Sequence, residues 1–300
     1  MPSGEFRPRL VAQAPAKINL GLAVLGRRPD GYHDIRTIFQ AIDLCDTLEV
    51  AERAEPGIAL RVAGPEWAPD GPENLVVRVG EALRGQYAPD RGAEIRLEKR
   101  IPAGAGLGGG SSDAAATLLA LERLWGLRLE PEARSRLALE IGSDVPFFLL
   151  GGTARGEGRG EILTPLPPPP PAYWALILPA FSVSTAQAYA EVSRSLTIPS
   201  NHLTMLEVAL AQANPDLLVR NFVNDLEAGV FRIEPELAAL KREVASVGVA
   251  VGLSGSGSAL FAMARNQGDA RRLQEWGGTR PEVRVVPCVP VGYGVRVREA

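Results

Sequence analysis

A glycine-rich segment in the first half of the chain has the composition of a phosphate-binding loop. It reads IPAGAGLGGGSSD at 101–113 and holds five glycines between positions 104 and 110. Without Cβ atoms, the backbone N–H groups of such a loop can approach an anion closely. A helix that begins directly after the loop adds the positive end of its dipole. We expect this segment to bind phosphate, and its terminal Ser-Ser-Asp to cap a helix over 114–125.

Other glycine loops with known functions fit this segment less well. No lysine follows the glycines, as a P-loop requires, and the chain lacks the His-Arg-Asp and Asp-Phe-Gly segments of protein kinases. Gly104, Gly106 and Gly109 match the dinucleotide pattern G-x-G-x-x-G, but they lie a third of the way along the chain and the region after them looks helical. A flexible linker remains as the alternative, although linkers do not usually separate an alternating strand from a capped helix.

Two charged residues stand at positions where they could act on a reacting group. Lys17 lies with Asn19 in the apolar stretch APAKINLGL, where a lysine is costly unless it faces a cleft or an anion. An exposed lysine on an edge strand is the alternative. Asp144 precedes the apolar run VPFFLL, so it either caps a helix or, if it lies near Lys17, takes a proton from an attacking hydroxyl.

A second glycine-rich segment, GLSGSGS at 252–258, lies near the other end of the chain. It does not match the hydrolase motif G-x-S-x-G, because Ser256 stands where that motif needs glycine. Both histidines precede it, which is against the order of the hydrolase triad. The segment is either a tight turn between two strands or a second glycine-rich wall that faces the phosphates.

The elements that must position these residues follow no regular alternation of strand and helix, which favours an α+β fold. In the first half we expect strands over 9–25, 36–43, 46–52, 57–63 and 93–99, with helices over 73–85 and 131–141. In the second half we expect strands over 173–179, 247–253, 259–264, 283–289 and 292–297, with helices over 185–195, 202–212, 215–229, 235–246 and 267–276. The proline run at 165–171 is either a stiff linker or a surface loop. We therefore divide the chain into domains 1–166 and 172–300.

Composition excludes several classes of protein. The chain has 300 residues, 46% of them hydrophobic, and a formal net charge of −3, which gives no electrostatic reason to expect nucleic acid or an acidic membrane as partner. Cys45 and Cys288 are far apart and form no C-x-x-C, so we expect neither a disulfide framework nor a zinc site. The N-terminal residues lack the hydrophobic core of a signal sequence, and no apolar run is long enough to span a membrane. We expect a cytoplasmic protein.

Three motifs, PAKIN at 15–19, PAGAGLGGGSS at 102–112 and GLSGSG at 252–257, resemble in sequence and order those of the GHMP small-molecule kinase superfamily. The resemblance implies a two-domain kinase fold with the active site in the cleft between the domains, and ATP and Mg²⁺ as cofactors. It implies that Asp144 is the general base and Lys17 its catalytic partner. The residues implied to bind ATP are Asn74, Lys99, Pro102, Ala103, Gly104, Ala105, Gly106, Leu107, Gly108, Gly109, Gly110, Ser111, Ser112 and Asp113.

Further segments are similar to one branch of this superfamily: DGYH at 30–33, ENL at 73–75, KRIP at 99–102 and GSDVPFF at 142–148. The Gly-Tyr-His of the first segment separates this branch from the galacto-, homoserine and mevalonate kinases. This similarity implies phosphorylation of the C2 hydroxyl of 4-diphosphocytidyl-2-C-methyl-D-erythritol in non-mevalonate isoprenoid synthesis. Since no Asp/Glu cluster marks a metal site, magnesium would be held by ATP oxygens and water, with a loop serine at most. The residues implied to bind the acceptor are Asn19, Tyr32, His33, Phe39, Thr185 and Tyr189.

Three alternative functions stay open from the sequence. The first is a superfamily member that acts on another alcohol, or a decarboxylase that phosphorylates its substrate only transiently. The second is a catalytically silent nucleotide-binding regulator, which the joint presence of Lys17 and Asp144 disfavours. The third is a nucleic-acid-binding module, which the net negative charge disfavours. We expect a monomer or a weak homodimer, with small molecules as its partners.

Overall fold

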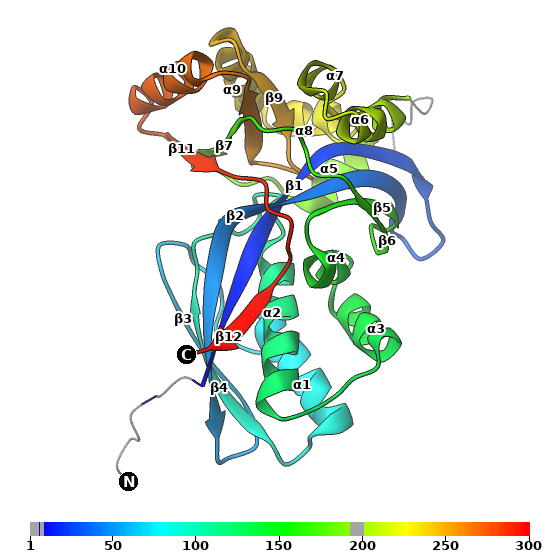
Figure 1. Ribbon diagram of the computed structural model, residues 1–300, viewed down its shortest axis with the longest axis vertical. Coiled ribbons are helices and arrows are strands. Elements are labelled where there is room, and N and C mark those ends of the chain that lie inside the picture. The colour runs from blue at the N-terminus through cyan, green and yellow to red at the C-terminus, as the bar shows by residue number, and fades with distance from the viewer. Residues whose placement is uncertain (1–5, 7–8, 193–200) are drawn as a thin grey trace.

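Two long antiparallel strands, β1 (Leu10–Arg27) and β2 (His33–Arg53), form the centre of the larger sheet in the computed structural model, which describes residues 6, 9–192 and 201–300 (Figure 1). Residues 14–24 of β1 are all buried, because other elements cover both faces of the strand there. Along its length β1 contributes side chains to three successive hydrophobic clusters, through Ala14, Leu20 and Leu22. It therefore connects the packing of both halves of the molecule.

The larger sheet has the order β12-β1-β2-β4-β3. β2 changes partner along its length: residues 47–53 pair with β4, whereas residues 35–40 pair with β5, which in turn pairs with β6. β8 lies parallel beside β1. The strands that complete this sheet are β3 (Gly57–Ala63), β4 (Gly92–Glu98), β5 (Thr153–Gly158), β6 (Ile162–Leu166), β8 (Val223–Asn224) and β12 (Arg296–Glu299).

Four helices lie below the smaller sheet in Figure 1: α1 and α2 contact strands of the larger sheet, whereas α3 and α4 pack against α2. α2 is almost completely buried, and its alanines at 114–116 and 120 are small enough to let the helix axis approach β1 and β2 closely. α1 and α3 cover α2 on its outer side. The four helices are α1 (Leu75–Tyr87), α2 (Gly109–Leu124), α3 (Pro131–Ile141) and α4 (Val145–Leu150).

The start of α2 differs from the expected one. The helix begins at Gly109, inside the glycine loop, and its N-cap residue is Gly108 in the left-handed conformation, without a side-chain cap. The predicted cap by the Ser-Ser-Asp at 111–113 is therefore wrong. Two of these residues bond elsewhere: Ser112 Oγ donates to the carbonyl oxygen of Pro15, and Asp113 pairs with Lys99.

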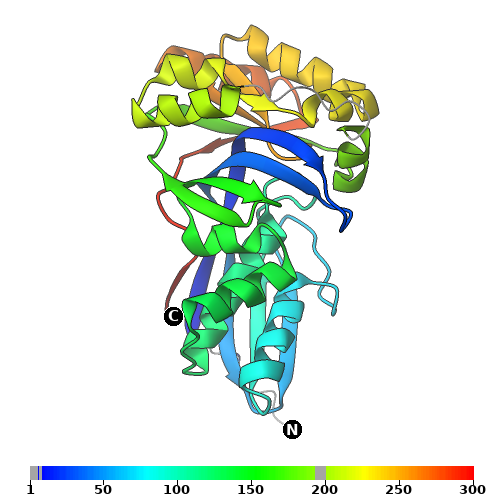
Figure 2. The ribbon, with the colours of Figure 1, turned by 90° about the vertical axis from the view of Figure 1, so that its right-hand side faces the viewer.

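The smaller sheet has the order β11-β7-β10-β9 and is entirely antiparallel. Figures 1 and 2 show this sheet and its helices at one end of the molecule and α1 at the other. Its strands are β7 (Tyr173–Pro179), β9 (Ala250–Leu253), β10 (Leu260–Ala264) and β11 (Val283–Cys288). The helices of this part are α5 (Thr185–Val192), α6 (His202–Ala211), α7 (Pro215–Arg220), α8 (Glu227–Ile233), α9 (Pro235–Ser246) and α10 (Gln267–Gly278).

The chain passes between the two parts of the molecule more than once. The proline run begins inside β6, where Pro165 pairs with Ala154, and then leads into β7 of the smaller sheet. β8 and β12 come later in the chain, yet both pair with β1 of the larger sheet. The change from one sheet to the other thus falls between β6 and β7, but two later strands return to the first sheet. The division into domains 1–166 and 172–300 stays a prediction.

Several predicted elements are wrong in detail. The expected helix over 215–229 is interrupted by β8, and the strand expected over 292–297 lies at 296–299. Residues 145–150 form a short helix with Asp144 at its N-cap position, although the Asp144 side chain makes no capping hydrogen bond. The last residues of the helix expected over 185–195 fall outside the described part of the chain. No helix within that described part is long and apolar enough to cross a membrane.

Candidate active site

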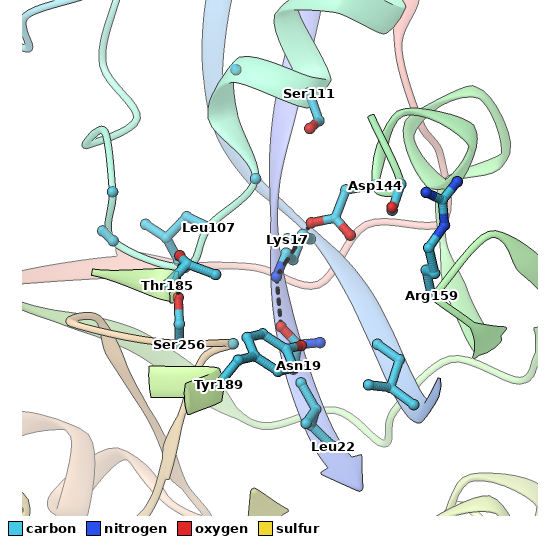
Figure 3. A pocket seen from close by; sticks show the side chains of 18 of the residues that line it. Lys17, Asn19, Leu22, Leu107, Ser111, Asp144, Arg159, Thr185, Tyr189 and Ser256 are labelled. Atoms are coloured by element: carbon cyan, nitrogen blue, oxygen red, sulfur yellow. Dashed lines mark hydrogen bonds and ion pairs between the residues drawn. The ribbon is translucent and has the colours of Figure 1, made fainter. Parts of the chain in front are cut away.

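A cavity of about 1180 Å³ lies where the glycine loop meets the later half of the chain. Side chains from β1, β2, the loop before α4, the start of α5 and the turn between β9 and β10 converge on it (Figure 3). The structure brings most of the predicted site residues together here. The predicted residues that line the cavity are Lys17, Asn19, Tyr32, His33, Phe39, all of 102–111, Asp144, Thr185 and Tyr189.

Lys17 and Asp144 face each other across the floor of this cavity. Lys17 Nζ lies 3.8 Å from Asp144 Oδ2, and the lysine side chain is 5% exposed whereas the aspartate side chain is 31% exposed. Burial lowers the pKa of the Lys17 ammonium, and the charge of Asp144 opposes that shift. The arrangement leaves a carboxylate that a bound molecule can reach, next to a cation that is shielded from water.

Close backbone contacts join the glycine loop to β1 and to the second glycine-rich segment. The backbone N–H of Lys17 donates to the carbonyl oxygen of Leu107 (3.0 Å). Ser254 Oγ donates to the carbonyl oxygen of Gly106 (3.0 Å), and a Cβ on Gly106 would lie only 2.1 Å from the Ser254 carbonyl oxygen. The segment at 252–258 is therefore both a turn between β9 and β10 and part of the cavity wall, to which it contributes Gly255 and Ser256.

Aromatic rings line the end of the cavity away from the glycine loop. The rings of His33 and Tyr189 stack with their centroids 5.1 Å apart. Tyr32 is 55% exposed, and the guanidinium of Arg159 lies 4.8 Å from its ring centroid. Burial lowers the pKa of His33, and the positive charge of Arg27 adds to the shift. This end of the cavity thus offers flat rings and an imidazole for a planar, polar group.

Four of the residues predicted to bind ATP do not line the cavity: Asn74, Lys99, Ser112 and Asp113. Asn74 caps α1 by accepting from the N–H of Val76. Lys99 lies beneath the glycine loop, where its Nζ bonds Asp113 Oδ2 at 2.8 Å and Asp46 Oδ2 at 2.5 Å. Contact of these four residues with a nucleotide stays a prediction, and the structure adds a role in supporting the loop.

Asp46 bonds the backbone at the start of the glycine loop, a contact that the sequence did not reveal. Its Oδ1 accepts from the backbone N–H groups of Arg100 and Ile101, directly before the glycine loop. Burial raises the pKa of Asp113 to about 8, and Asp46 adds to the shift while Lys99 opposes it. The second oxygen of Asp113, Oδ1, is buried without a hydrogen-bond partner, which also favours the neutral acid. Asp46 is 53 residues from Lys99, so no local pattern signals the cluster.

Arg27 and Arg159 also line the cavity without having been predicted. Arg27 is the last residue of β1, before the turn that leads to Tyr32 and His33. Its closeness to these two residues in the sequence was the only sign that it would line the cavity. Arg159 lies in the turn between β5 and β6, two short strands that the sequence did not predict. Together with Lys17, these residues give the cavity a surplus of positive charge suited to anionic groups.

Comparison with known proteins agrees with this geometry. The family model of the GHMP kinases N terminal domain matches residues 74–152, and that of the GHMP kinases C terminal domain matches residues 206–275. A relative from Pelotomaculum thermopropionicum, named 4-diphosphocytidyl-2-C-methyl-D-erythritol kinase, is 42% identical over 265 residues, which cover 88% of this chain and 92% of the relative. The chain belongs to the 4-diphosphocytidyl-2-C-methyl-D-erythritol kinase family. A relative of the same name from Geobacter sulfurreducens is 41% identical over 274 residues, covering 89% and 94% of the two chains.

Solved structures show the same family and the same fold. A crystal structure of 4-(cytidine 5'-diphospho)-2C-methyl-D-erythritol kinase matches with a TM-score of 0.78 at 37% identity, covering 94% of this chain and 100% of that one. A homoserine kinase from Cytophaga hutchinsonii matches equally well in shape (TM-score 0.78) at 20% identity, which shows the fold alone. The predicted α+β GHMP kinase fold is confirmed. Membership of this kinase family also identifies the chain as an ATP-dependent small-molecule kinase.

Proposed function

We propose that this protein transfers the γ-phosphoryl group of ATP to the C2 hydroxyl of 4-diphosphocytidyl-2-C-methyl-D-erythritol, a step in the non-mevalonate synthesis of isoprenoid precursors. The observation that carries the proposal is the meeting of three features in one cavity: the glycine loop, the Lys17–Asp144 pair and the His33–Tyr189 stack. Named relatives at about 40% identity over most of the chain support the same acceptor.

In this proposal each part of the cavity has its own task. Backbone N–H groups of the glycine loop bind the phosphates of ATP, because no side chains keep the anion away. Asp144, partly exposed, takes the proton of the acceptor hydroxyl, and Lys17 balances the charge that develops on the transferred phosphoryl group. The aromatic end holds the cytosine ring, which Tyr32 and His33 recognise, and Tyr189 stacks on His33 in the same part of the cavity. Phosphoryl transfer depends mainly on such positioning and charge stabilisation.

The residues present fit a magnesium ion that arrives with ATP. Among the residues that the structure describes, no group of three or more His, Cys, Asp or Glu side chains is placed to hold a metal. The Ser111 hydroxyl lines the cavity in the glycine loop, so a hard cation held mainly by ATP oxygens and water would find one protein oxygen there. When bound, the ion supplies positive charge to the phosphate oxygens of ATP.

The proposal is tested by ADP release in the presence of Mg-ATP. We expect turnover with the cytidyl diphosphate of methylerythritol and none with mevalonate, homoserine or galactose, and ³¹P NMR should show a new phosphomonoester at C2. Turnover with another of these alcohols alone would overturn the acceptor assignment but keep the kinase. We further expect the enzyme to act in the cytoplasm and to be a monomer or weak homodimer. Sedimentation of the purified protein measures its oligomeric state.

A further inference from the structure

A chain of three hydrogen bonds starts at the ammonium of Lys17 and ends at a backbone carbonyl. Lys17 Nζ donates to Asn19 Oδ1 (2.6 Å), and Asn19 Nδ2 donates to Thr37 Oγ1 (2.8 Å). Thr37 Oγ1 in turn donates to the carbonyl oxygen of Gly21 (2.7 Å). The three side chains are buried, with Lys17 4%, Asn19 2% and Thr37 0% exposed. Figure 3 shows the first of these bonds at the centre of the cavity.

The direction of this chain follows from the donors and acceptors available. A carbonyl oxygen can only accept, so the hydroxyl hydrogen of Thr37 is committed to Gly21. The Thr37 oxygen is then left as an acceptor, and the side-chain group of Asn19 that faces it must be the NH₂ group. The carbonyl oxygen of the same amide therefore faces Lys17. An amide that rotated by 180° would turn two N–H donors toward an ammonium and a lone-pair oxygen toward another oxygen.

The backbone places these groups by means of an irregular strand pair. Lys17 and Asn19 lie two residues apart on β1, and the register between β1 and β2 shifts between Asn19 and Gly21. Such a bulge re-aims side chains locally and is frequent next to active sites. Thr37 comes from β2 and does not line the cavity, so it has no direct access to a bound molecule.

We propose that Thr37 is a positioning residue, which fixes the amide orientation of Asn19 and thereby holds the Lys17 ammonium in place. Those tests of this inference that measure kcat rest on the proposed kinase function. The nearest carboxylate to Lys17 is that of Asp144, at 3.8 Å. If the Asn19 oxygen no longer accepts from Lys17, the buried ammonium lacks an acceptor. Movement toward this carboxylate would then provide one and stabilise the charge. A direct Lys17–Asp144 contact would occupy the base and withdraw the cation from the phosphoryl group.

The first test compares two substitutions of Thr37. Thr37→Val keeps the shape of the side chain but removes the hydroxyl, whereas Thr37→Ser keeps the hydroxyl. We expect Thr37→Val to lower kcat roughly 10-fold with little change in the KM for ATP, since the Asn19 amide loses the bond that keeps its oxygen toward the Lys17 ammonium. Thr37→Ser should stay within about twofold of the unmodified enzyme. Equal loss in both variants would overturn the inference, because it would indicate a packing role alone.

A double-mutant cycle shows whether Thr37 acts through Asn19. In an Asn19→Ala background the amide is absent, so adding Thr37→Val should change kcat no further. A full additional loss in that background would contradict the proposed route. Failure of the proposed function itself would appear in the unmodified protein, which would then not turn over the cytidyl acceptor. The variants would in that case be compared by the following readout, which needs no substrate.

NMR of the lysine side chains reads the same interaction without turnover. The chain has only three lysines, Lys17, Lys99 and Lys241, so ¹³C-lysine labelling gives three Cε signals to follow with pH. The charge of Asp144 raises the pKa of Lys17, so movement of the ammonium toward this carboxylate should raise it further. We therefore expect the pKa of Lys17 to rise in Thr37→Val and to stay unchanged in Thr37→Ser. The signals of Lys99 and Lys241 serve as internal controls. An unchanged Lys17 titration in Thr37→Val would overturn the inference.

Discussion

Burial of Lys17 gives the cavity a cation whose neighbours are few and defined. The side chain is only 5% exposed, and its ammonium has the Asn19 amide at 2.6 Å, Asp144 at 3.8 Å and the ring of Phe39 at 5.6 Å. In a poorly hydrated site a charge acts more strongly on a reacting group than it would in water. The same burial makes the position of this ammonium sensitive to each neighbouring group.

Replacement of Asp144 tests the assignment of the base. We expect Asp144→Asn to lower kcat by roughly 10²–10⁴, the usual contribution of a general base. Binding of ATP, measured by calorimetry, should stay close to that of the unmodified enzyme, because the glycine loop is unchanged. Asp216→Asn is the matched control, since this carboxylate is 59% exposed and lies on α7, outside the cavity lining. Near-normal turnover in Asp144→Asn would remove Asp144 from the role of base.

The buried cluster of Asp46, Lys99 and Asp113 predicts a pH dependence of stability. Burial raises the pKa of Asp113 in the folded protein to about 8, above the ordinary value of 3.8 for an aspartate. The folded state therefore binds more protons than the unfolded state between these values, and the stabilising contribution of the neutral acid is lost as pH rises through that window.

Thermal unfolding measured between pH 5 and pH 9 checks this sign. As pH rises, we expect the Tm of the unmodified protein to fall more steeply than that of Asp113→Asn. The amide of this variant keeps an acceptor for Lys99 and cannot ionise. Asp216→Asn controls for an exposed carboxylate. Parallel Tm curves for Asp113→Asn and the unmodified protein would show that Asp113 does not titrate in this range.

At the scale of the elements, the glycine loop depends on the turn between β9 and β10. Gly106 has φ +76° and no room for a Cβ, which would lie 2.1 Å from the Ser254 carbonyl oxygen. We expect Gly106→Ala to raise the KM for ATP about tenfold or more, since the left-handed conformation alone costs about 1–2 kcal/mol for a residue with a side chain. Gly85→Ala in α1 is the control, because its Cβ would meet no atom within 4 Å. Unchanged ATP binding in Gly106→Ala would mean that the loop tolerates displacement.

The sequence predicted the elements whose signals are local. Helix α9 was expected over 235–246 and lies at Pro235–Ser246, because an amphipathic pattern and a proline in the first turn mark it. β5 and β6 were missed, since TARGEG and ILTPL are short, contain glycine or proline and show little alternation. The motif residues that line the cavity were predicted through their resemblance to known kinases. Asp46 and Thr37 were not, because each acts through a partner that is distant in the sequence.

At the scale of the whole molecule, residues near the end of the chain pack against the helix that follows Asp144. Val295 N–H donates to the carbonyl oxygen of Phe148 in α4 (2.9 Å), and β12 then pairs with β1. A Cβ on Gly294 would lie 2.1 Å from the same Phe148 oxygen. The segment after β11 therefore supports both the strand that carries Lys17 and the helix that begins beside Asp144.

Substitution of Gly294 tests the importance of this contact. We expect Gly294→Ala to push the segment away from α4 and to lower both the Tm and kcat, because the loss of close packing reaches Asp144 through α4. Gly292→Ala is the matched control two residues earlier, where a Cβ would meet nothing within 4 Å. If Gly294→Ala matched Gly292→Ala in both measurements, the segment would be a passive covering of the sheet.

The pairing of β12 with β1 also bears on how the protein is made. Leu10 lies opposite Glu299, so β1 and β12 are neighbours in the sheet although they are far apart in the sequence. During synthesis β1 therefore leaves the ribosome long before β12. Until residues 296–299 emerge, the outer edge of β1 beside residues 10–13 has no partner strand. An unpaired strand edge is a template for pairing with other chains, and domains generally begin to fold during synthesis. A nascent chain halted before β12 should therefore be more prone to aggregate than the finished enzyme.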